Sequence, residues 1–159
     1  MPKIAPYAFT TLHPHMGKLK FDNYKEIIIE DLPGLIEGAH INKGLGHRFL
    51  KHIERAKILI FLLDGSNNPS SIRNPANDLL VLKNELLQYK QNLMDKPYIV
   101  VINKNDKIEK KLFDQNVEAV KKVLKNSNVY LLDISAKYSN NLNKLVSLIY
   151  YLNEKVSNN

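Results

Sequence analysis

Short apolar runs, each ending in or next to a polar residue, recur along the chain. Four of them are Lys25–Asp31, Ile58–Asp64, Tyr98–Asn103 and Val129–Ile134. Continuous apolar runs of this length are typical of strands that are buried on both faces of a parallel sheet. A further strand near Gly17–Phe21 is predicted to form a hairpin with the first run, because only a short turn separates the two.

The segments between these runs carry apolar residues three or four positions apart, which is the spacing of one face of a helix. The stripes are Phe49, Leu50 and Ile53; Leu79, Leu82, Leu86 and Leu93; Phe113, Val117, Val120 and Leu124; and Leu142, Leu145, Ile149, Leu152 and Val156. Alternating strands and helices predict a three-layer α/β sandwich, in which right-handed crossovers connect a mainly parallel sheet. With 159 residues, we expect one domain and no second.

The composition is that of a globular protein, with 44% apolar and 25% charged residues. No apolar stretch is long enough to span a membrane, and the first residues contain no apolar segment of the kind found in signal peptides. The chain has no cysteine, which excludes disulfides, thiolate metal sites and cysteine nucleophiles.

The charge balance is basic, with a formal net charge of +7 and an isoelectric point near 9.4. An excess of lysine and arginine favours a polyanionic partner, RNA above all. The alternative is that lysine-rich helix faces simply keep the protein in solution.

The first chemical motif stands where the first run ends, at Asp31-Leu32-Pro33-Gly34. Ligands of such sheets bind at the carboxyl ends of the strands. The Asp31 carboxylate would hold Mg²⁺ through a water molecule, and the unobstructed N–H of Gly34 would approach a γ-phosphate. Taken alone, the pattern also fits an ordinary turn after a strand.

A second motif, Asn103-Lys104-Asn105-Asp106, follows the third run. The Asp106 carboxylate offers two acceptors side by side, which match the N1–H and 2-amino donors of guanine and which adenine cannot satisfy. Asn103 would tie the loop and reach the base edge, while the stem of Lys104 would cover the base or the ribose. A polar surface turn is the alternative interpretation.

Two weaker signals complete the set. Ser135-Ala136-Lys137 follows the fourth run, where a small residue would let a backbone N–H approach the guanine O6. Thr10 and Thr11 precede the hairpin, where a hydroxyl would complete the Mg²⁺ shell, although a pair of threonines capping a loop is an alternative. Together the motifs are a more specific signal than each is alone, because they follow clearly predicted strands in the order that a guanine-nucleotide domain uses.

These residues sit in longer stretches that resemble the G domain of Obg-family GTPases. The stretches are Pro2–Ala5, Tyr7–Leu12, Asp31–Ala39 and Gly44–Arg55, and the resemblance covers nearly the whole chain. The segment Gly38–Gly44 is most similar to the animal mitochondrial branch of that family. The resemblance implies a P-loop NTPase-like fold, binding of GTP and GDP with Mg²⁺, and a role in assembly of the large ribosomal subunit, with rRNA or that subunit as partner. It also implies a mitochondrial location, with the nucleolus or cytoplasm as alternatives.

Residue by residue, the resemblance makes Thr11 a Mg²⁺ ligand and Asp31 a water-mediated one. The nucleotide contacts that it implies are Phe9, Thr10, Thr11, Leu12, His13, Asp31, Leu32, Pro33, Gly34, Asn103, Lys104, Asn105, Asp106, Ser135, Ala136 and Lys137. Leu35 stands where Ras-type proteins have a water-orienting glutamine, so slow hydrolysis is expected and no catalytic residue is identified.

One family motif, G-x-x-x-x-G-K-[ST], does not occur in the 159 residues. We therefore expect residues 1–159 to be a partial G domain, without the first strand, phosphate loop and first helix, and inactive alone. The expected slot for that strand lies between Lys25–Asp31 and Ile58–Asp64; alternatively these two strands pair directly, or a partner chain fills the slot. The alternative function is a non-catalytic ribosome- or RNA-interacting remnant. An RNA-binding domain unrelated to GTP leaves the motif set unexplained.

Overall fold

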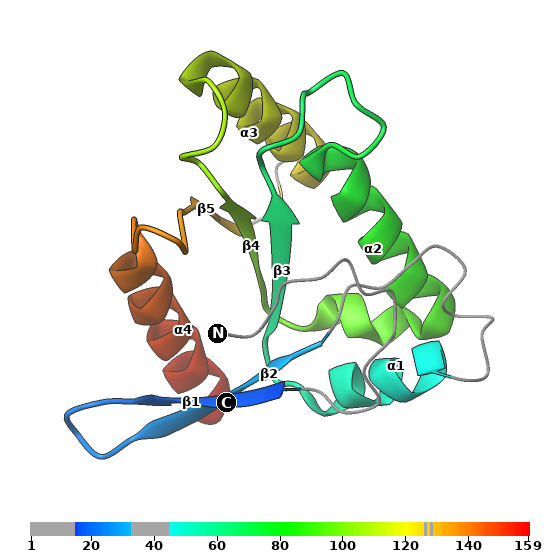
Figure 1. Cartoon of the computed structure of the whole chain (residues 1–159). Coiled ribbons are helices and arrows are strands. Elements are labelled where there is room, and N and C mark those ends of the chain that lie inside the picture. Colours follow the sequence, from blue (N-terminus) through cyan, green and yellow to red (C-terminus); the bar gives the residue numbers. More distant parts are fainter. Residues whose placement is uncertain (1–14, 33–44, 126, 128) are drawn as a thin grey trace.

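The computed structural model describes residues 15–32, 45–125, 127 and 129–159, and it shows the predicted alternation of strands and helices (Figure 1). In chain order the elements are β1 (His15–Lys20), β2 (Glu26–Asp31), α1 (Leu45–Arg55), β3 (Leu59–Asp64), α2 (Pro75–Tyr89), the 3-10 helix η2 (Gln91–Asp95), β4 (Tyr98–Asn103), α3 (Lys110–Leu124), β5 (Tyr130–Asp133) and α4 (Leu142–Ser157). Among the described helices, none has the length and apolar character needed to cross a bilayer.

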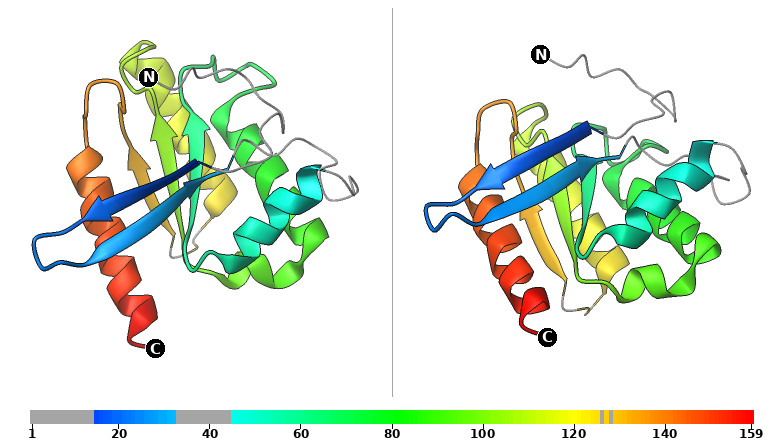
Figure 2. Two further views of the ribbon diagram at one scale, coloured as in Figure 1. Left: turned by 60° about the horizontal axis from the view of Figure 1, so that its bottom comes forward. Right: turned by 90° about the horizontal axis from the view of Figure 1, so that it is seen from below.

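Three parallel strands in the order β3-β4-β5 form the central sheet. Helix α4 covers one face of this sheet, and α1, α2 and α3 lie on the other, which confirms the three-layer α/β sandwich (Figure 2). Strand β4 is the middle strand, and its side chains at 99–102 are fully buried. Val100 and Ile102 pack into the core beneath α1, α2 and α3, whereas Ile99 and Val101 pack against α4.

Burial on both faces was predicted for every apolar run, and for β3 this prediction is wrong. Leu59, Phe61 and Leu63 are buried, but Leu62 between them is 60% exposed and Ile60 is 36% exposed. The physical reason is that, in the described part of the chain, β3 pairs with β4 alone and no helix covers its α4-side face. Periodicity reports which residues are apolar, but it does not report whether a neighbour covers them.

Strands β1 and β2 form a separate antiparallel hairpin, which confirms the predicted pairing and moves its first strand to begin at His15. The inner face of the hairpin, with Leu19, Ile27 and Ile29, packs against the α4 core. On its outer face Ile28 is 61% exposed, so β2 too is buried on one side only. Within the described residues β2 and β3 do not pair, so the alternative of direct pairing between them is wrong.

Polar contacts fasten the hairpin to α4. The Lys25 ammonium lies 2.6 Å from the Glu154 carboxylate, and Asn23 donates to the Tyr150 hydroxyl at 2.7 Å. The rings of Phe21 and Tyr150 pack together in a tilted arrangement, with their centroids 4.7 Å apart. The position of β2, and with it Asp31, is therefore set from α4.

The stripe predicted to run through Leu93 is interrupted. Helix α2 ends at Tyr89 because Lys90 adopts an extended backbone conformation, with φ −160° and ψ 116°. Leu93 lies instead in η2, where it is still buried in the core. The apolar spacing thus identified a core residue correctly and assigned it to the wrong helix.

Helix α1 is held at its carboxyl end by a lysine from a different part of the chain. The Lys96 ammonium donates to the carbonyl oxygens of Ile53, Glu54 and Ala56, at 3.0, 2.6 and 2.5 Å. The last carbonyls of a helix lack partners within the helix, and a cation is also attracted to the negative end of the helix dipole. Lys96 therefore fixes the end of α1 against the start of β4.

Candidate functional site at the strand ends

The carboxyl ends of β3, β4 and β5 lie side by side, and the segments that follow them emerge along one edge of the molecule (Figure 2). The strand register is the cause, since Asp64 pairs with Asn103 and Ile102 pairs with Asp133. Motif residues that are far apart in sequence are thereby brought together. This edge is the candidate functional site.

Several hydrogen bonds join the loop after β4 to the end of β5 and the loop that follows it, and three of them involve Asn103 or Asn105. Ala136 N–H donates to Asn103 Oδ1 at 3.0 Å, and Asn105 N–H donates to the Ile134 carbonyl at 3.1 Å. The Asn105 side-chain amide donates to the Asp133 carboxylate at 2.9 Å. The two loops consequently form one unit rather than two independent turns.

Asp106 lies at the outer end of this unit with an exposed side chain. Its Oδ1 accepts a hydrogen bond from the Ser135 hydroxyl at 2.6 Å. Ser135 itself is 1% exposed, and its backbone pairs with Asn140 at 3.2 and 3.0 Å. The buried hydroxyl of a residue with an anchored backbone therefore orients the carboxylate of Asp106, which is itself exposed.

Lys104 points away from Asp106 and toward the end of β3. Its backbone lies in the left-handed region, with φ 68°. Its ammonium donates to Asp64 Oδ2 at 2.6 Å. Asp64 is a site residue that the sequence motifs did not identify; the only signal was that the apolar run before it ends in an acid.

The remaining two residues of the last motif are exposed. The Lys137 ammonium lies 5.1 Å from the centre of the Tyr138 ring, and Ala136 contributes its N–H to Asn103. The structure thus brings Asn103–Asp106 and Ser135–Lys137 together at one edge.

Asp31 and Leu32 stand apart from this group, at the end of the hairpin strand β2. The Asp31 side chain is exposed, whereas Leu32 packs against the core shared with α1 and α2. The other predicted contacts of this part of the site lie outside the described residues: Phe9, Thr10, Thr11, Leu12, His13, Pro33 and Gly34.

The described residues contain no cluster of three or more histidine, aspartate or glutamate side chains that would cage a metal ion. Mg²⁺ does not require one, because it commonly binds one or two protein oxygens and takes its other ligands from water and substrate phosphates. An exposed carboxylate at a strand end, such as that of Asp31, has the donor chemistry that Mg²⁺ prefers. Asp31 therefore fits a magnesium site that is completed by a nucleotide.

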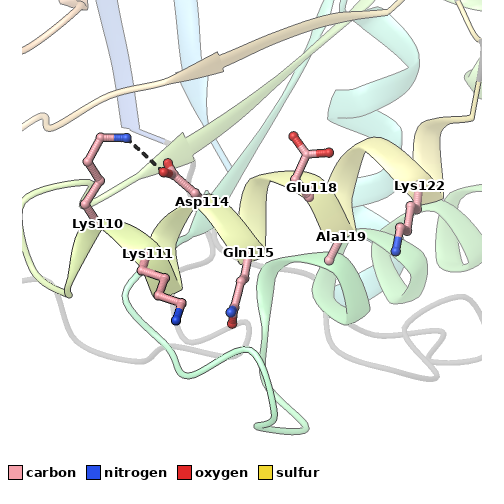
Figure 3. A pocket seen from close by; sticks show the side chains of 7 residues that line it. All are labelled: Lys110, Lys111, Asp114, Gln115, Glu118, Ala119 and Lys122. Atoms are coloured by element: carbon pink, nitrogen blue, oxygen red, sulfur yellow. Dashed lines mark hydrogen bonds and ion pairs between the residues drawn. The ribbon is translucent and has the colours of Figure 1, made fainter.

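A groove also lies along α3 (Figure 3). It is lined by Lys110, Lys111, Asp114, Gln115, Glu118, Ala119 and Lys122. Charges of both signs line it, and Lys110 and Asp114 form an exposed ion pair at 2.8 Å. Exposed ion pairs of this kind contribute little to stability. Because it carries charges of both signs, the groove selects no particular ligand. The connected, partly buried polar network at the strand ends is the better candidate.

Comparison with known proteins shows the family to which the chain is related. A family model described as "50S ribosome-binding GTPase" matches residues 1–104. The chain is 48% identical to GTP-binding protein 10 of Danio rerio, over 74% of this chain and 32% of that protein. It is 43% identical to GTPase Obg of Protochlamydia amoebophila, over 91% of this chain and 41% of that protein. The chain therefore spans less than half the length of these curated relatives.

Solved structures of GTP-binding proteins have the same fold. A crystal structure of Era in complex with MgGDPNP and nucleotides of 16S ribosomal RNA superposes with a TM-score of 0.68 and 28% sequence identity. The match covers 92% of this chain and 46% of that one. The fold is that of a P-loop NTPase-like G domain.

Proposed function

The chain belongs to the family of 50S ribosome-binding GTPases, and on that basis we propose that it is an Obg-type protein that binds GTP and GDP at the ends of β4 and β5. The observation that carries the proposal is the Ser135–Asp106 contact of 2.6 Å within a loop pair that Asn103 and Asn105 join. An isolated polar turn would not need a buried hydroxyl to orient an exposed carboxylate.

The chemistry of the loop pair selects guanine over adenine. The solvent-facing side of the Asp106 carboxylate offers acceptors for the N1–H and 2-amino groups of guanine, and adenine lacks that pair of donors. Asn103 would reach the base edge, a backbone N–H near Ala136 would approach O6, and the Lys104 stem would cover the base or the ribose. Asn105 and Lys137 complete the proposed base-binding set.

The phosphate end of the nucleotide would lie toward Asp31. We assign the Mg²⁺ ion to Thr11 directly and to Asp31 through water, with the γ-phosphate approached by the segment Leu32–Gly34. Further nucleotide contacts would come from Phe9, Thr10, Leu12 and His13. Mg²⁺ would neutralise phosphate charge when it is bound. Because only GTP carries the γ-phosphate, GTP and GDP would differ in how they order the two segments, Phe9–His13 and Leu32–Gly34.

The partner that we propose is the large ribosomal subunit, with GTP hydrolysis resetting the switch during its assembly. Three observations support this: the family's description, the Obg relatives, and the basic charge of +7. The RNA-bound Era structure shows that a related fold contacts ribosomal RNA. The resemblance of the segment Gly38–Gly44 to the animal mitochondrial branch of the family supports a mitochondrial location.

The first prediction concerns base specificity. In the full-length protein, Asp106→Asn should weaken GTP binding by roughly 1.5–3 kcal/mol, because a charge-assisted contact is lost. Xanthosine triphosphate should gain affinity, because the new amide donates where xanthine carries a carbonyl. Nucleotide titration by calorimetry measures both. Asp95→Asn is the matched control, an exposed aspartate before the opposite end of β4. Unchanged GTP affinity in Asp106→Asn would contradict the assignment.

The second prediction concerns the switch. Thr11→Ala should leave GDP affinity nearly intact, because the hydroxyl is assigned to the GTP-bound Mg²⁺ shell. It should abolish the extra protection from proteolysis that GTP with Mg²⁺ gives to the segment around residues 9–13. Limited proteolysis in each nucleotide state measures this. Ser147→Ala, an exposed hydroxyl on α4, is the control. A Thr11→Ala protein that still distinguishes GTP from GDP as the wild type does would refute the role.

The third prediction concerns the partner. A tagged full-length protein should fractionate with mitochondria and sediment with the large ribosomal subunit when a non-hydrolysable GTP analogue is present. With GDP, more of it should remain at the top of the gradient. Sedimentation that does not depend on the nucleotide would favour the non-catalytic ribosome-binding alternative, and a protein absent from mitochondria would overturn the proposed location.

A further inference from the structure

The loop after β3 is built closely against the proposed base-binding loop. Gly65 N–H donates to the Asn103 carbonyl at 2.9 Å. A side chain at Gly65 would not fit, because its Cβ would lie 2.6 Å from Ile102 Cγ2 and 2.9 Å from the Asn103 carbonyl oxygen, and would also meet the Phe113 ring. The backbones of the two loops can approach this closely only because position 65 is glycine.

The same loop is anchored from the other side by a buried asparagine. Asn116, which is 1% exposed on α3, donates through its side-chain amide to the carbonyls of Gly65 at 3.1 Å and Asn67 at 2.8 Å. The segment that begins at Asp64 is thus fixed by contacts to β4 and to α3, neither of which involves Lys104.

The Asp64 carboxylate connects this fixed segment to the base-binding loop. Its Oδ1 accepts from Ser66 N–H at 2.9 Å and from the Ser66 hydroxyl at 2.6 Å. Its Oδ2 accepts from the Lys104 ammonium at 2.6 Å, and both side chains are 36% exposed. One oxygen therefore orients the carboxylate, and the other holds the lysine.

Because the Asp64 side is rigid, Lys104 is the partner that becomes ordered. A lysine side chain has four rotatable bonds and loses substantial entropy when it is immobilised. Here it is tied at both ends, by a left-handed backbone at φ 68° and by an ion pair across the ends of β4 and β3. Its stem therefore spans the carboxyl ends of β4 and β3, at the edge where the nucleotide would bind.

We propose that Asp64 is a positioning residue of the guanine-nucleotide site, which holds the Lys104 side chain extended so that its stem is in place before the nucleotide arrives. This inference rests on the proposed function and adds to it a residue outside the motifs. If the side chain is ordered in advance, the entropy lost in ordering it no longer reduces the affinity for the nucleotide. The alternative is that Asp64 competes with the nucleotide for Lys104.

The protonation of Asp64 agrees with the geometry. Burial acts to raise the pKa of the carboxyl, but hydrogen bonds from Lys104 and Ser66 outweigh it and hold the pKa of Asp64 below its usual value. The carboxylate is therefore ionised at neutral pH, and its contact with Lys104 is charge-assisted.

The test is a double-mutant cycle in the full-length protein, read by fluorescent GDP titration. Asp64→Asn retains the shape of the side chain and the acceptor for Ser66, but it removes the charge. It should weaken GDP binding by about 2- to 12-fold, which corresponds to the cost of ordering one long side chain. In a Lys104→Met background the same change should have little further effect. Asp114→Asn, which breaks the exposed pair with Lys110, is the control and should not alter affinity.

Two outcomes of the cycle overturn the inference while leaving the proposed function in place. An equal loss in both backgrounds would show that Asp64 acts independently of Lys104. Unchanged or tighter binding in Asp64→Asn would show that the pair does not prepare the site. A wild-type protein that binds no guanine nucleotide would instead overturn the proposed function, and this inference with it.

A second measurement needs no nucleotide. Carbon-13 NMR titration of the Asp64 carboxyl should show its pKa rising toward the usual value in Lys104→Met, because a charge-assisted donor is lost. The folding of each variant is checked in the same spectra. An Asp64 carboxyl that titrates identically in wild type and Lys104→Met would overturn the pairing itself.

Discussion

The parallel pairing of β4 between β3 and β5 is the constraint on which the candidate site depends. The four fully buried side chains at 99–102 hold β4 in the middle of the sheet, and its register places Asp64 beside Asn103 and Asp133 beside Ile102. The contacts between the loops of the site depend on that alignment. A shift by one residue would turn the alternating side chains to the opposite face and separate Asp106 from Ser135.

The two ends of the proposed nucleotide site lie on different sheets. The base-binding loops follow β4 and β5, whereas Asp31 ends the hairpin strand β2, which α4 holds through Lys25. Within the described residues no strand pairing joins the two sheets. A ligand that contacts both would therefore couple them, which is what a nucleotide-dependent switch requires.

The sequence predicted best what depends on continuous local patterns. The β4 run was assigned with its true bounds, because a strand covered on both faces is apolar at every position. The exposure of Leu62 was not foreseen, since it depends on which neighbours cover β3, and Leu93 was assigned to the wrong helix because one extended residue, Lys90, ends α2. Asn103 and Asp106 were found through a motif. Asp64 belongs to no sequence motif, because its role arises only from the strand register that places it beside the Lys104 loop.

The central claim is that the ends of β4 and β5 form a guanine-specific site. The most direct measurement is a pair of NMR titrations of the isotope-labelled full-length protein, one with GDP and one with ADP. The amides of Asn103–Asp106 and Ser135–Lys137 should shift with GDP at concentrations where ADP leaves them unchanged. Equal shifts with ADP, or shifts confined to the α3 groove or the opposite edge of the sheet, would contradict the claim.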